Sequence, residues 1–434
     1  MKPPAIVSLL WNPNLHVLAA FAARHPAVTV LSPEGMITPS AASAITQAGG
    51  QVLGLDSLLS DEDRQGISEA LAGCERDLAQ AMRQPSWARH WRDFPLPADT
   101  LAQILSQVSA AQLPTLFRLI AGMERARSRY DLRLILTNED VTSLTRTRVA
   151  WGRQHDVRTV HLSHGGELFQ PYNAHAGVYA DITAIFGERA TEGYRDIGVD
   201  VSSLRVTGNP AWDDYARLRS RRSEIRTAIA AEHGLSPALP IVVFGTTWAS
   251  NQTAYGDEGI HGNTLRMFLS AARQLVQSGL TAQFIVKDRP GAPPAAHEQI
   301  PRLFPAYGLP AACIRYVSGE AMPWVVGADV VISMQSNLAL EAMMAGTPAV
   351  DLLNETALWL GPCFTADSGV IEVEASSLAD TLRDILTDDR LRAQQLANQA
   401  RSARRYNIGV DGSGTRRFLD LLDELLPAGW AAAA

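Results

Sequence analysis

The chain has 434 residues, of which 46% are hydrophobic and 19% charged, and its formal net charge is −7. This length is sufficient for two domains of ordinary size. The mild acidity argues against a general nucleic-acid binder, which needs an excess of Lys and Arg along one face. The three cysteines, Cys74, Cys313 and Cys363, are far apart and include no C-x-x-C pair, which favours buried thiols in a reducing compartment.

No stretch of the sequence approaches the roughly 18–20 uninterrupted apolar residues of a membrane span. The apolar run at residues 5–10 is also too short for the core of a signal peptide. We therefore expect a soluble cytoplasmic protein. This expectation leaves room for peripheral association with the inner face of the cytoplasmic membrane.

Short β-branched runs alternate with helical stretches in the first half of the chain. The expected strands are Ala5–Leu10, Val28–Leu31, Gln51–Leu55, Leu132–Thr137, Arg158–Leu162, Ile182–Phe186 and Leu204–Thr207. A helical stretch interrupted by prolines occupies about residues 61–129, and its Trp87, Trp91 and Phe94 are candidates for an acceptor groove or for the core. The alternation predicts a parallel sheet covered by helices on both faces.

The alternation of expected strands and helices begins again after a polar helical stretch and a loop at residues 213–240. The expected strands here are Ile241–Gly245, Gln283–Lys287, Ile314–Val317, Val330–Ser333 and Ala349–Leu353. We predict an N-terminal Rossmann-like acceptor lobe at 1–215, a C-terminal Rossmann-like nucleotide-donor lobe at 236–405, and a terminal loop and helix at 406–430 that crosses back to the first lobe. Ligands of open α/β sheets bind beyond the carboxyl ends of the strands, which predicts a cleft that both sheets face.

The segment from Asp329 to Pro348 carries the clearest chemical signal. It reads as a strand, a polar turn containing Gln335, Ser336 and Asn337, and a helix. The free N–H groups and the dipole at the start of that helix favour a phosphate. Glu341, in the second turn of the helix, is placed to accept hydrogen bonds from a ribose diol. The alternative is a simple helix cap with a solvated Glu341.

The pattern D-x-x-I-S-x-x-S-x-x-x-x-E-A-x-x-x-G-x-P in this segment resembles the donor motif of GT-B glycosyltransferases. It is particularly similar to the group that includes the CDP-glycerol glycerophosphotransferases, the bacterial capsule Kdo transferases and the non-hydrolysing UDP-GlcNAc 2-epimerases. The resemblance implies an α/β fold of the GT-B type. It also implies that the turn at Ser336 holds phosphate and that Glu341 holds the ribose.

Candidates for the catalytic base lie in the first half of the chain. One expected strand ends in His164-Gly165-Gly166, where the glycines allow close backbone approach and a histidine titrates near neutrality. This stretch resembles the His-Gly element of the glycerophosphotransferases, which implies a catalytic His164; the alternative is a histidine that only bonds the turn. Glu139 and Asp140 follow another strand and are further candidate bases, or charges at a helix N-terminus.

Two motifs mark the passage between the expected lobes. The string V-T-G-N-P-x-x-D, with Gly208 and Asn209, is similar to the end of the first lobe in the 2-epimerases and indicates a hinge. Thr246 and Thr247 end the first strand of the second lobe, where the sequence resembles the P-T-W element of the glycerophosphotransferases. These two threonines are candidates for contacts with phosphate. The alternative is that they only end the strand.

Lys287 and Arg289 stand where those families have a K-x-H-P element, with Arg289 in the place of the histidine. Both side chains are suited to neutralise a diphosphate or a sugar carboxylate, and arginine does so bidentately. The change from histidine to arginine separates this chain from the glycerophosphotransferases.

The sequence contains no P-loop, no H-E-x-x-H and no G-x-S-x-G element. We expect no metal and no cofactor, because GT-B enzymes neutralise the leaving diphosphate with helix dipoles and side chains. The predicted function is transfer of a sugar from a nucleotide-activated donor to a saccharide, lipid-linked or protein-linked hydroxyl, in bacterial surface polysaccharide or glycoconjugate synthesis. The alternatives are a UDP-sugar 2-epimerase, a CDP-glycerol-type polyol-phosphate transferase, and a non-catalytic pair of sugar- or nucleotide-binding lobes.

Overall fold

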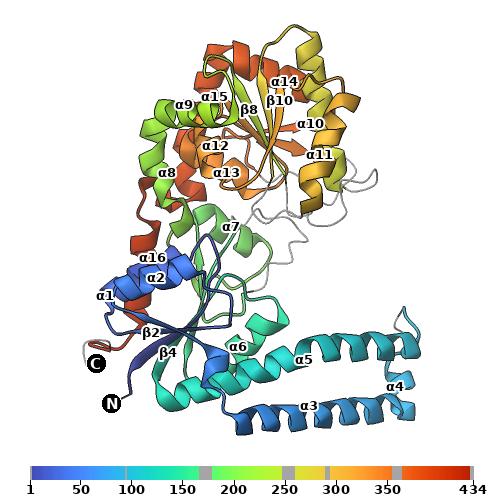
Figure 1. Ribbon diagram of the computed structural model, residues 1–434, viewed down its shortest axis with the longest axis vertical. Coiled ribbons are helices and arrows are strands. Elements are labelled where there is room, and N and C mark those ends of the chain that lie inside the picture. Colours follow the sequence, from blue (N-terminus) through green and yellow to red (C-terminus); the bar gives the residue numbers. More distant parts are fainter. Residues whose placement is uncertain are drawn as a thin grey trace. The chain divides into compact units, whose positions relative to one another are not determined.

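The computed structural model describes residues 2–92, 95–165, 178–246, 260–288, 294–353 and 364–430 (Figure 1). Its contacts group the chain into two compact units. The first unit comprises Met1–Leu162, Gly177–Thr183 and Leu419–Ala434, and the second comprises Ser163–Ala176 and Ala184–Phe418. The lobe boundaries at 215, 236 and 405 stay predictions.

Seven strands form one sheet in the order β3-β2-β1-β4-β5-β6-β7. They are β1 (Pro4–Leu9), β2 (Thr29–Ser32), β3 (Gln51–Gly54), β4 (Asp131–Thr137), β5 (Arg158–Leu162), β6 (Ile182–Ile185) and β7 (Leu204–Val206). The pairs whose register is defined run parallel. The seven strands expected from the apolar runs are therefore confirmed, with ends that differ by a residue or two.

Six strands form the other sheet in the order β10-β9-β8-β11-β12-β13, again with parallel pairs. They are β8 (Ile241–Gly245), β9 (Gln283–Lys287), β10 (Ile314–Val317), β11 (Val330–Ser333), β12 (Ala349–Leu353) and β13 (Ile371–Glu374). Five of them were expected from the sequence. The edge strand β13 was missed because its I-E-V-E sequence is short and half polar.

Both sheets have the doubly wound strand order of a Rossmann fold, in which the chain starts in the middle and fills one side before the other. The direction of winding reverses between β1 and β4 in the first sheet and between β8 and β11 in the second. Ligands of such sheets bind at the carboxyl ends of the strands at this switch point. The fold therefore defines one candidate position in each sheet.

Helices flank the sheets. The first half of the chain forms α1 (His16–Arg24), α2 (Pro39–Gln47), η1 (Leu55–Leu58), α3 (Asp61–Met82), α4 (Pro85–His90), α5 (Ala98–Arg129), α6 (Ser143–Gln154) and α7 (Glu188–Asp196). After β7 come η3 (Pro210–Trp212), α8 (Asp213–Leu218), η4 (Arg219–Arg221), α9 (Arg222–His233), α10 (Ile260–Gln277), α11 (Pro294–Ala306), α12 (Met322–Gly327), α13 (Asn337–Ala345), α14 (Ala375–Thr387), α15 (Asp389–Tyr406), η6 (Ile408–Asp411) and α16 (Gly414–Leu425). Among the residues that the structure describes, no helix is both long and apolar enough to cross a bilayer.

The predicted helical insert is a hairpin of two long helices. Figure 1 shows α3 and α5 side by side, extending away from the first sheet, with α4 at their far end. A capping box starts α3, in which the Ser60 side chain accepts from the N–H of Asp63 and Asp63 accepts from the N–H of Ser60. Asp63 also accepts from Arg125 of α5 at 2.5 Å, which ties the two helices together near the sheet.

The end of α16 belongs to the first unit, although it is the last helix of the chain. Arg24 of α1 donates to Asp420 and to Asp423 at 2.7 Å each. The indole N–H of Trp430 donates to the carbonyl of Asp131, at the start of β4, at 3.3 Å. The first unit is thus built from both ends of the chain.

Candidate functional site

The turn from β11 into α13 is held in place by hydrogen bonds. Ser336 caps the helix, and its Oγ accepts from the N–H of Leu338 at 3.3 Å. Gln335 has a left-handed backbone with φ of +46°, which costs free energy for a residue other than glycine. Its N–H donates to Oδ1 of Asp351 at 2.8 Å. The predicted phosphate-binding turn therefore has a defined conformation that Asp351 supports from the next strand.

Asp351 is a functional candidate that sequence reasoning missed. Its side chain is fully buried in β12, where Oδ1 also accepts from the hydroxyl of Ser333 at 3.0 Å. Its other oxygen, Oδ2, makes no hydrogen bond within the part of the chain that is described. Burial raises the pKa of Asp351 to about 7, against the two hydrogen bonds that lower it. The available signal was a single Asp in the apolar run A-V-D-L-L.

Glu341 lies on α13 and is bound to a tyrosine. The hydroxyl of Tyr215 in α8 donates to Oε2 of Glu341 at 2.5 Å. Burial raises the pKa of Glu341 to about 7, although the bond from Tyr215 and the charge of Lys287 lower it. Burial and the neighbouring carboxylate hold the pKa of Tyr215 well above its usual range. Glu341 is thus no solvated helix residue, and Tyr215 is a partner that the sequence did not reveal.

Lys287 ends β9 and is 2% exposed. Its ammonium group donates to the carbonyl of Asp288 and, at 2.7 Å, to that of Gly319. Burial lowers the pKa of Lys287 to about 8, and the nearby carboxylates of Asp288, Glu320 and Glu341 limit the drop. The buried ammonium of Lys287 and the half-buried carboxyl group of Glu341, whose pKa values shift in opposite directions, therefore lie within electrostatic reach of each other.

Thr246 follows β8 at the switch point of the second sheet. Its N–H donates to the carbonyl of Lys287 at 3.0 Å, and its hydroxyl donates to Asp288. Tyr316 donates to the other oxygen of Asp288 at 2.7 Å. Both hydrogen-bond donors of Thr246 are thus used inside the unit, and its contact with phosphate stays a prediction. Sequence reasoning missed Asp288.

The backbone at His164 lies beside the first turn of α13. The side-chain amide of Asn337 donates to the carbonyl of His164 at 3.2 Å. A Cβ on Gly165 would lie 3.7 Å from the same amide group. The structure therefore brings together two predicted site segments that are 173 residues apart. The predicted site residues Gly166, Thr247 and Arg289 lie outside the described residues.

Glu139 lies at the switch point of the first sheet, after β4. One of its oxygens accepts from the N–H groups of Val141 and Thr142, both at 2.9 Å, and the other accepts from the Thr142 hydroxyl at 2.7 Å. Burial raises its pKa, but these hydrogen bonds outweigh the effect and the net shift is downward. The carboxylate stays charged and organises the start of α6, which is the helix-terminal role considered from the sequence.

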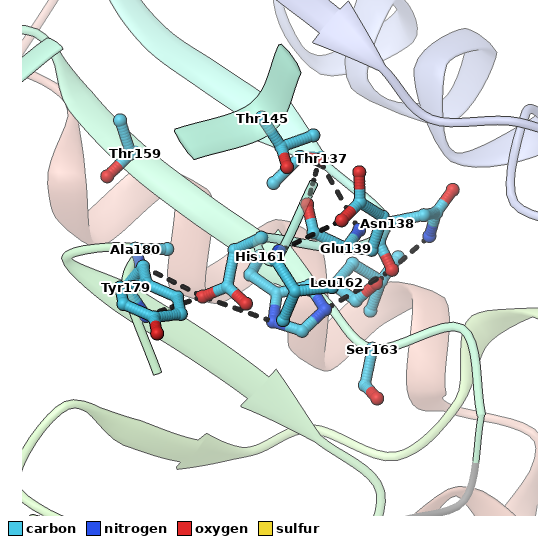
Figure 2. A network of polar contacts seen from close by, with 12 residues as sticks. Thr137, Asn138, Glu139, Thr145, Thr159, His161, Leu162, Ser163, Tyr179 and Ala180 are labelled. Carbon is cyan, nitrogen blue, oxygen red and sulfur yellow. Dashed lines mark hydrogen bonds and ion pairs between the residues drawn. The ribbon is translucent and has the colours of Figure 1, made fainter. Parts of the chain in front are cut away.

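Asp140 also binds backbone, and Figure 2 labels its neighbours Tyr179, Ala180 and His161. Its Oδ2 accepts from the N–H groups of Tyr179 at 2.7 Å and Ala180 at 3.0 Å, and its side chain is 1% exposed. The ring of His161 lies in the same network, with Nδ1 3.9 Å from this oxygen and Nε2 3.2 Å from the carbonyl of Asn138. The network connects the ends of β4 and β5 to the segment before β6.

Arg148 is a buried arginine on α6. It is 3% exposed, and its Nε and Nη1 have no partner in the described part of the chain. Burial lowers its pKa to about 9, and the charge of Glu139 opposes this shift. Nothing in the sequence pattern of α6 indicates that this arginine faces inward.

The predicted hinge string makes contacts within the second unit. Gly208 has φ of +83°, and a Cβ there would clash with the backbone of Gly409. Asn209 is 2% exposed; its N–H donates to Asn407 at 3.0 Å, and its side chain accepts from Ala211 at 3.0 Å. These contacts dock the segment after β7 onto the loop before α16.

The fold can be compared with known proteins. The sequence matches no protein-family model and no curated protein. Among solved structures, a glycosyltransferase from Rickettsia africae superposes with a TM-score of 0.56 at 10% identity, over 98% of this chain and 99% of the other. Anabaena HepE in complex with UDP and glucose gives 0.54 at 14% identity, over 97% and 100%.

The UDP-GlcNAc 2-epimerase from Neisseria meningitidis, bound to UDP-GlcNAc, gives a TM-score of 0.56 at 11% identity, over 98% of this chain and 100% of the other. Identities this low establish the fold alone. The prediction of an α/β fold of the GT-B type, with two parallel Rossmann-like sheets, is confirmed.

Proposed function

We propose that this protein is a nucleotide-sugar-dependent glycosyltransferase. The observation that carries the proposal is the arrangement in the second unit, where Lys287 at the end of β9 is buried, Glu341 of α13 is half-buried and bound to Tyr215, and the pKa values of Lys287 and Glu341 are both perturbed. Perturbed titratable groups at a switch point are typical of functional sites. Structures of the same fold contain UDP with glucose and UDP-GlcNAc, which supports a nucleotide-sugar ligand.

In the proposed donor complex, the diphosphate binds at the turn formed by Gln335, Ser336 and Asn337, where helix N–H groups favour an anion. Lys287 supplies a positive charge from the end of β9. Glu341 accepts hydrogen bonds from the ribose diol through its carboxylate, which the Tyr215 hydroxyl holds in position by its bond to Oε2. The proposed reaction is independent of a metal ion, because the helix N-terminus and Lys287 neutralise the negative charge of the diphosphate.

The proposed reaction transfers a sugar to a hydroxyl group. The acceptor oxygen forms a bond to the anomeric carbon, the bond from that carbon to the phosphate oxygen breaks, and the nucleoside diphosphate leaves with the electron pair. His164 takes the acceptor proton. The hydrogen bond from Asn337 to the carbonyl of His164 supports this role, because it joins the candidate base to the helix of the donor site. A saccharide or lipid-linked acceptor in surface polysaccharide synthesis fits this chemistry.

A thermal-shift screen tests the donor assignment. We expect one of the UDP-, GDP-, CDP- or dTDP-linked sugars to raise the melting temperature selectively, since a ligand that binds only the folded state stabilises it. At the same ligand concentration, the shift is expected to be clearly smaller in Glu341→Gln and unchanged in the matched control Glu232→Gln, whose side chain is exposed on α9. Equal shifts in both variants, or no shift with any nucleotide, would contradict the proposal.

A UDP-sugar 2-epimerase is the second candidate, because the Neisseria epimerase shares the fold over the whole chain and the hinge string V-T-G-N-P resembles its family. Incubation with UDP-GlcNAc and no acceptor separates the two. Appearance of the C2-epimerised nucleotide sugar supports the epimerase. Unchanged UDP-GlcNAc, together with acceptor-dependent release of UDP, supports the transferase.

A further inference from the structure

The far end of the α3–α5 hairpin carries a local excess of basic residues. Between Asp77 and Asp93 the sequence contains no acidic residue, but it contains Arg83, Arg89 and Arg92, in a chain whose net charge is −7. We define residues 83–92 as the hairpin tip; they follow α3 and include α4. The tip is therefore a local cationic surface on an acidic protein.

The three arginines of the tip are exposed. Within the part of the chain that the structure describes, none of them forms an ion pair or a hydrogen bond through its side chain. This distinguishes them from Arg125 nearer the sheet, which pairs with Asp63 at 2.5 Å. Cations that have no internal partner and share one end of a hairpin are suited to a negatively charged surface.

The tip also carries two tryptophans in a fixed arrangement. The rings of Trp87 and Trp91 lie 5.6 Å apart, and the indole N–H of Trp87 donates to the carbonyl of Ala98 at 3.2 Å, which ties α4 to the start of α5. Both side chains are half-buried. Tryptophan beside arginine is the combination found at the interface between lipid headgroups and acyl chains, where the ring is amphipathic and the cation meets phosphate.

Apolar side chains continue from the tip along α5. Leu96 is 40% exposed, and Ile104 and Val108, one helical turn apart, are 40% and 43% exposed. The outer part of α5 buries little, because Leu101 is its only buried residue before Leu119 in the described helix. α3, which is 22 residues or about 33 Å long, buries none. Internal packing thus explains neither the length of the hairpin nor the apolar residues near its end.

We propose that the hairpin tip binds the surface of an anionic phospholipid membrane, with the arginines on the headgroup phosphates and the tryptophans and Leu96 at the level of the glycerol. The charge of the tip favours a membrane over an apolar protein groove as its partner. Binding in such a groove would remove three unpaired guanidinium groups from water, which is costly. The inference goes beyond the proposed glycosyl transfer and does not depend on it, because binding to lipid requires no nucleotide.

Co-sedimentation of the full chain with vesicles tests the proposal. We expect binding to vesicles of phosphatidylcholine and phosphatidylglycerol that weakens with added salt, and little binding to phosphatidylcholine alone. The triple variant Arg83→Gln, Arg89→Gln, Arg92→Gln is expected to lose roughly a hundredfold in partitioning, since each cation near the surface contributes about a factor of five. Leu96→Ser alone is expected to weaken binding severalfold.

A matched control removes the same charge elsewhere: Arg217→Gln, Arg302→Gln, Arg390→Gln, all at exposed positions of the second unit. We expect this variant to sediment like the parent protein. Absence of binding to anionic vesicles at low salt would overturn the proposal, and so would equal losses in the two triple variants. Capture of an acidic protein partner by the tip, without vesicle binding, would overturn it in favour of a protein interface. The nucleotide-induced thermal shift of each variant reports separately on the proposed function.

Discussion

Two regions of this molecule hold carboxyl groups in opposite electrostatic situations: the end of β4 in the first sheet, and the segment from α13 to β12 in the second unit. At the first sheet, Glu139 and Asp140 receive backbone N–H groups at 2.7–3.0 Å, and the pKa of Glu139 is lowered. At the second sheet, burial raises the pKa of Glu341 and of Asp351 to about 7. A carboxylate whose oxygens accept from backbone N–H groups is a structural anchor, whereas one with a raised pKa and an oxygen left for further hydrogen bonds is suited to a ligand.

The difference shows that position after a strand does not by itself identify a catalytic acid or base. Glu139 and Asp140 directly follow β4, whereas Glu341 lies in α13 and Asp351 within β12, and the sequence predicted the first three of these as site residues. What separates them is the number of donors that the local backbone presents to each oxygen. We therefore expect substitutions in the first region to change stability, and those in the second to change ligand binding.

The largest effect is expected from Asp140→Ala. The change leaves the part-buried N–H of Tyr179 and the buried N–H of Ala180 without their acceptor, and two bonds to a charged group correspond to about 3 kcal/mol of unfolding free energy. Chemical denaturation measures it, with the exposed Asp384→Ala as control. If folded Asp140→Ala keeps its nucleotide affinity, the anchor role is supported; a specific loss of turnover with unchanged stability would return Asp140 to the catalytic candidates.

Glu341→Gln is expected to weaken nucleotide-sugar binding by about 2 kcal/mol, or roughly thirtyfold, because a charge-assisted bond to the ribose is replaced by a neutral one. Isothermal titration calorimetry provides the measurement. Tyr215→Phe serves as the companion variant, since it leaves the carboxylate but removes the donor at 2.5 Å. A smaller loss of affinity is expected in Tyr215→Phe. An unchanged affinity in Glu341→Gln would contradict the assignment of Glu341 to ligand binding.

Asp351→Asn is expected to flatten the dependence of stability on pH. The folded pKa of about 7 lies above the ordinary 3.8, so the folded state binds more protons between about pH 4 and 7 and loses stability as the pH rises through that window. The neutral amide retains its oxygen for Ser333 and Gln335 but has no such slope. We expect the variant to gain about 1–2 kcal/mol relative to the parent between pH 6 and pH 8. If the unfolding free energies of the two proteins change with pH in the same way, the raised pKa of Asp351 is contradicted.

The smallest effect is a maximum in donor affinity between about pH 7 and pH 8. Below it Glu341, with a pKa of about 7, becomes protonated and accepts less well; above it Lys287, with a pKa of about 8, loses its charge. We expect a severalfold drop on each side, measured with a nucleotide sugar whose diphosphate does not titrate in this range. The acidic limb is expected to disappear in Glu341→Gln, and its persistence there would assign it to another group.

The sheets could be predicted because their strands are short apolar runs buried on both faces, and the parallel order follows from the alternation with helices. The position of the α13 turn could be predicted as well, since a polar cluster between a strand and a helix is a local signal. Tyr215, Asp288 and Asp351 could not. The role of each depends on a partner from another segment, as Tyr215 and Glu341 show across 126 residues.

Arg148 could not be predicted for a related reason. Arginines on amphipathic helices usually face solvent, and α6 has basic residues on several faces. Only the packing of the helix decides which of them turns inward.

The division of the first unit between both ends of the chain has a consequence for biosynthesis. Helix α1 and strand β4 leave the ribosome early, but their partners Asp420, Asp423 and Trp430 emerge some 300–400 residues later. The sheet of the second unit is therefore fully synthesised before the C-terminal residues of the first unit emerge. In a chain that folds as it is synthesised, the N-terminal sheet must wait for the C-terminal helix, and its exposed face is the part most in need of protection by a chaperone.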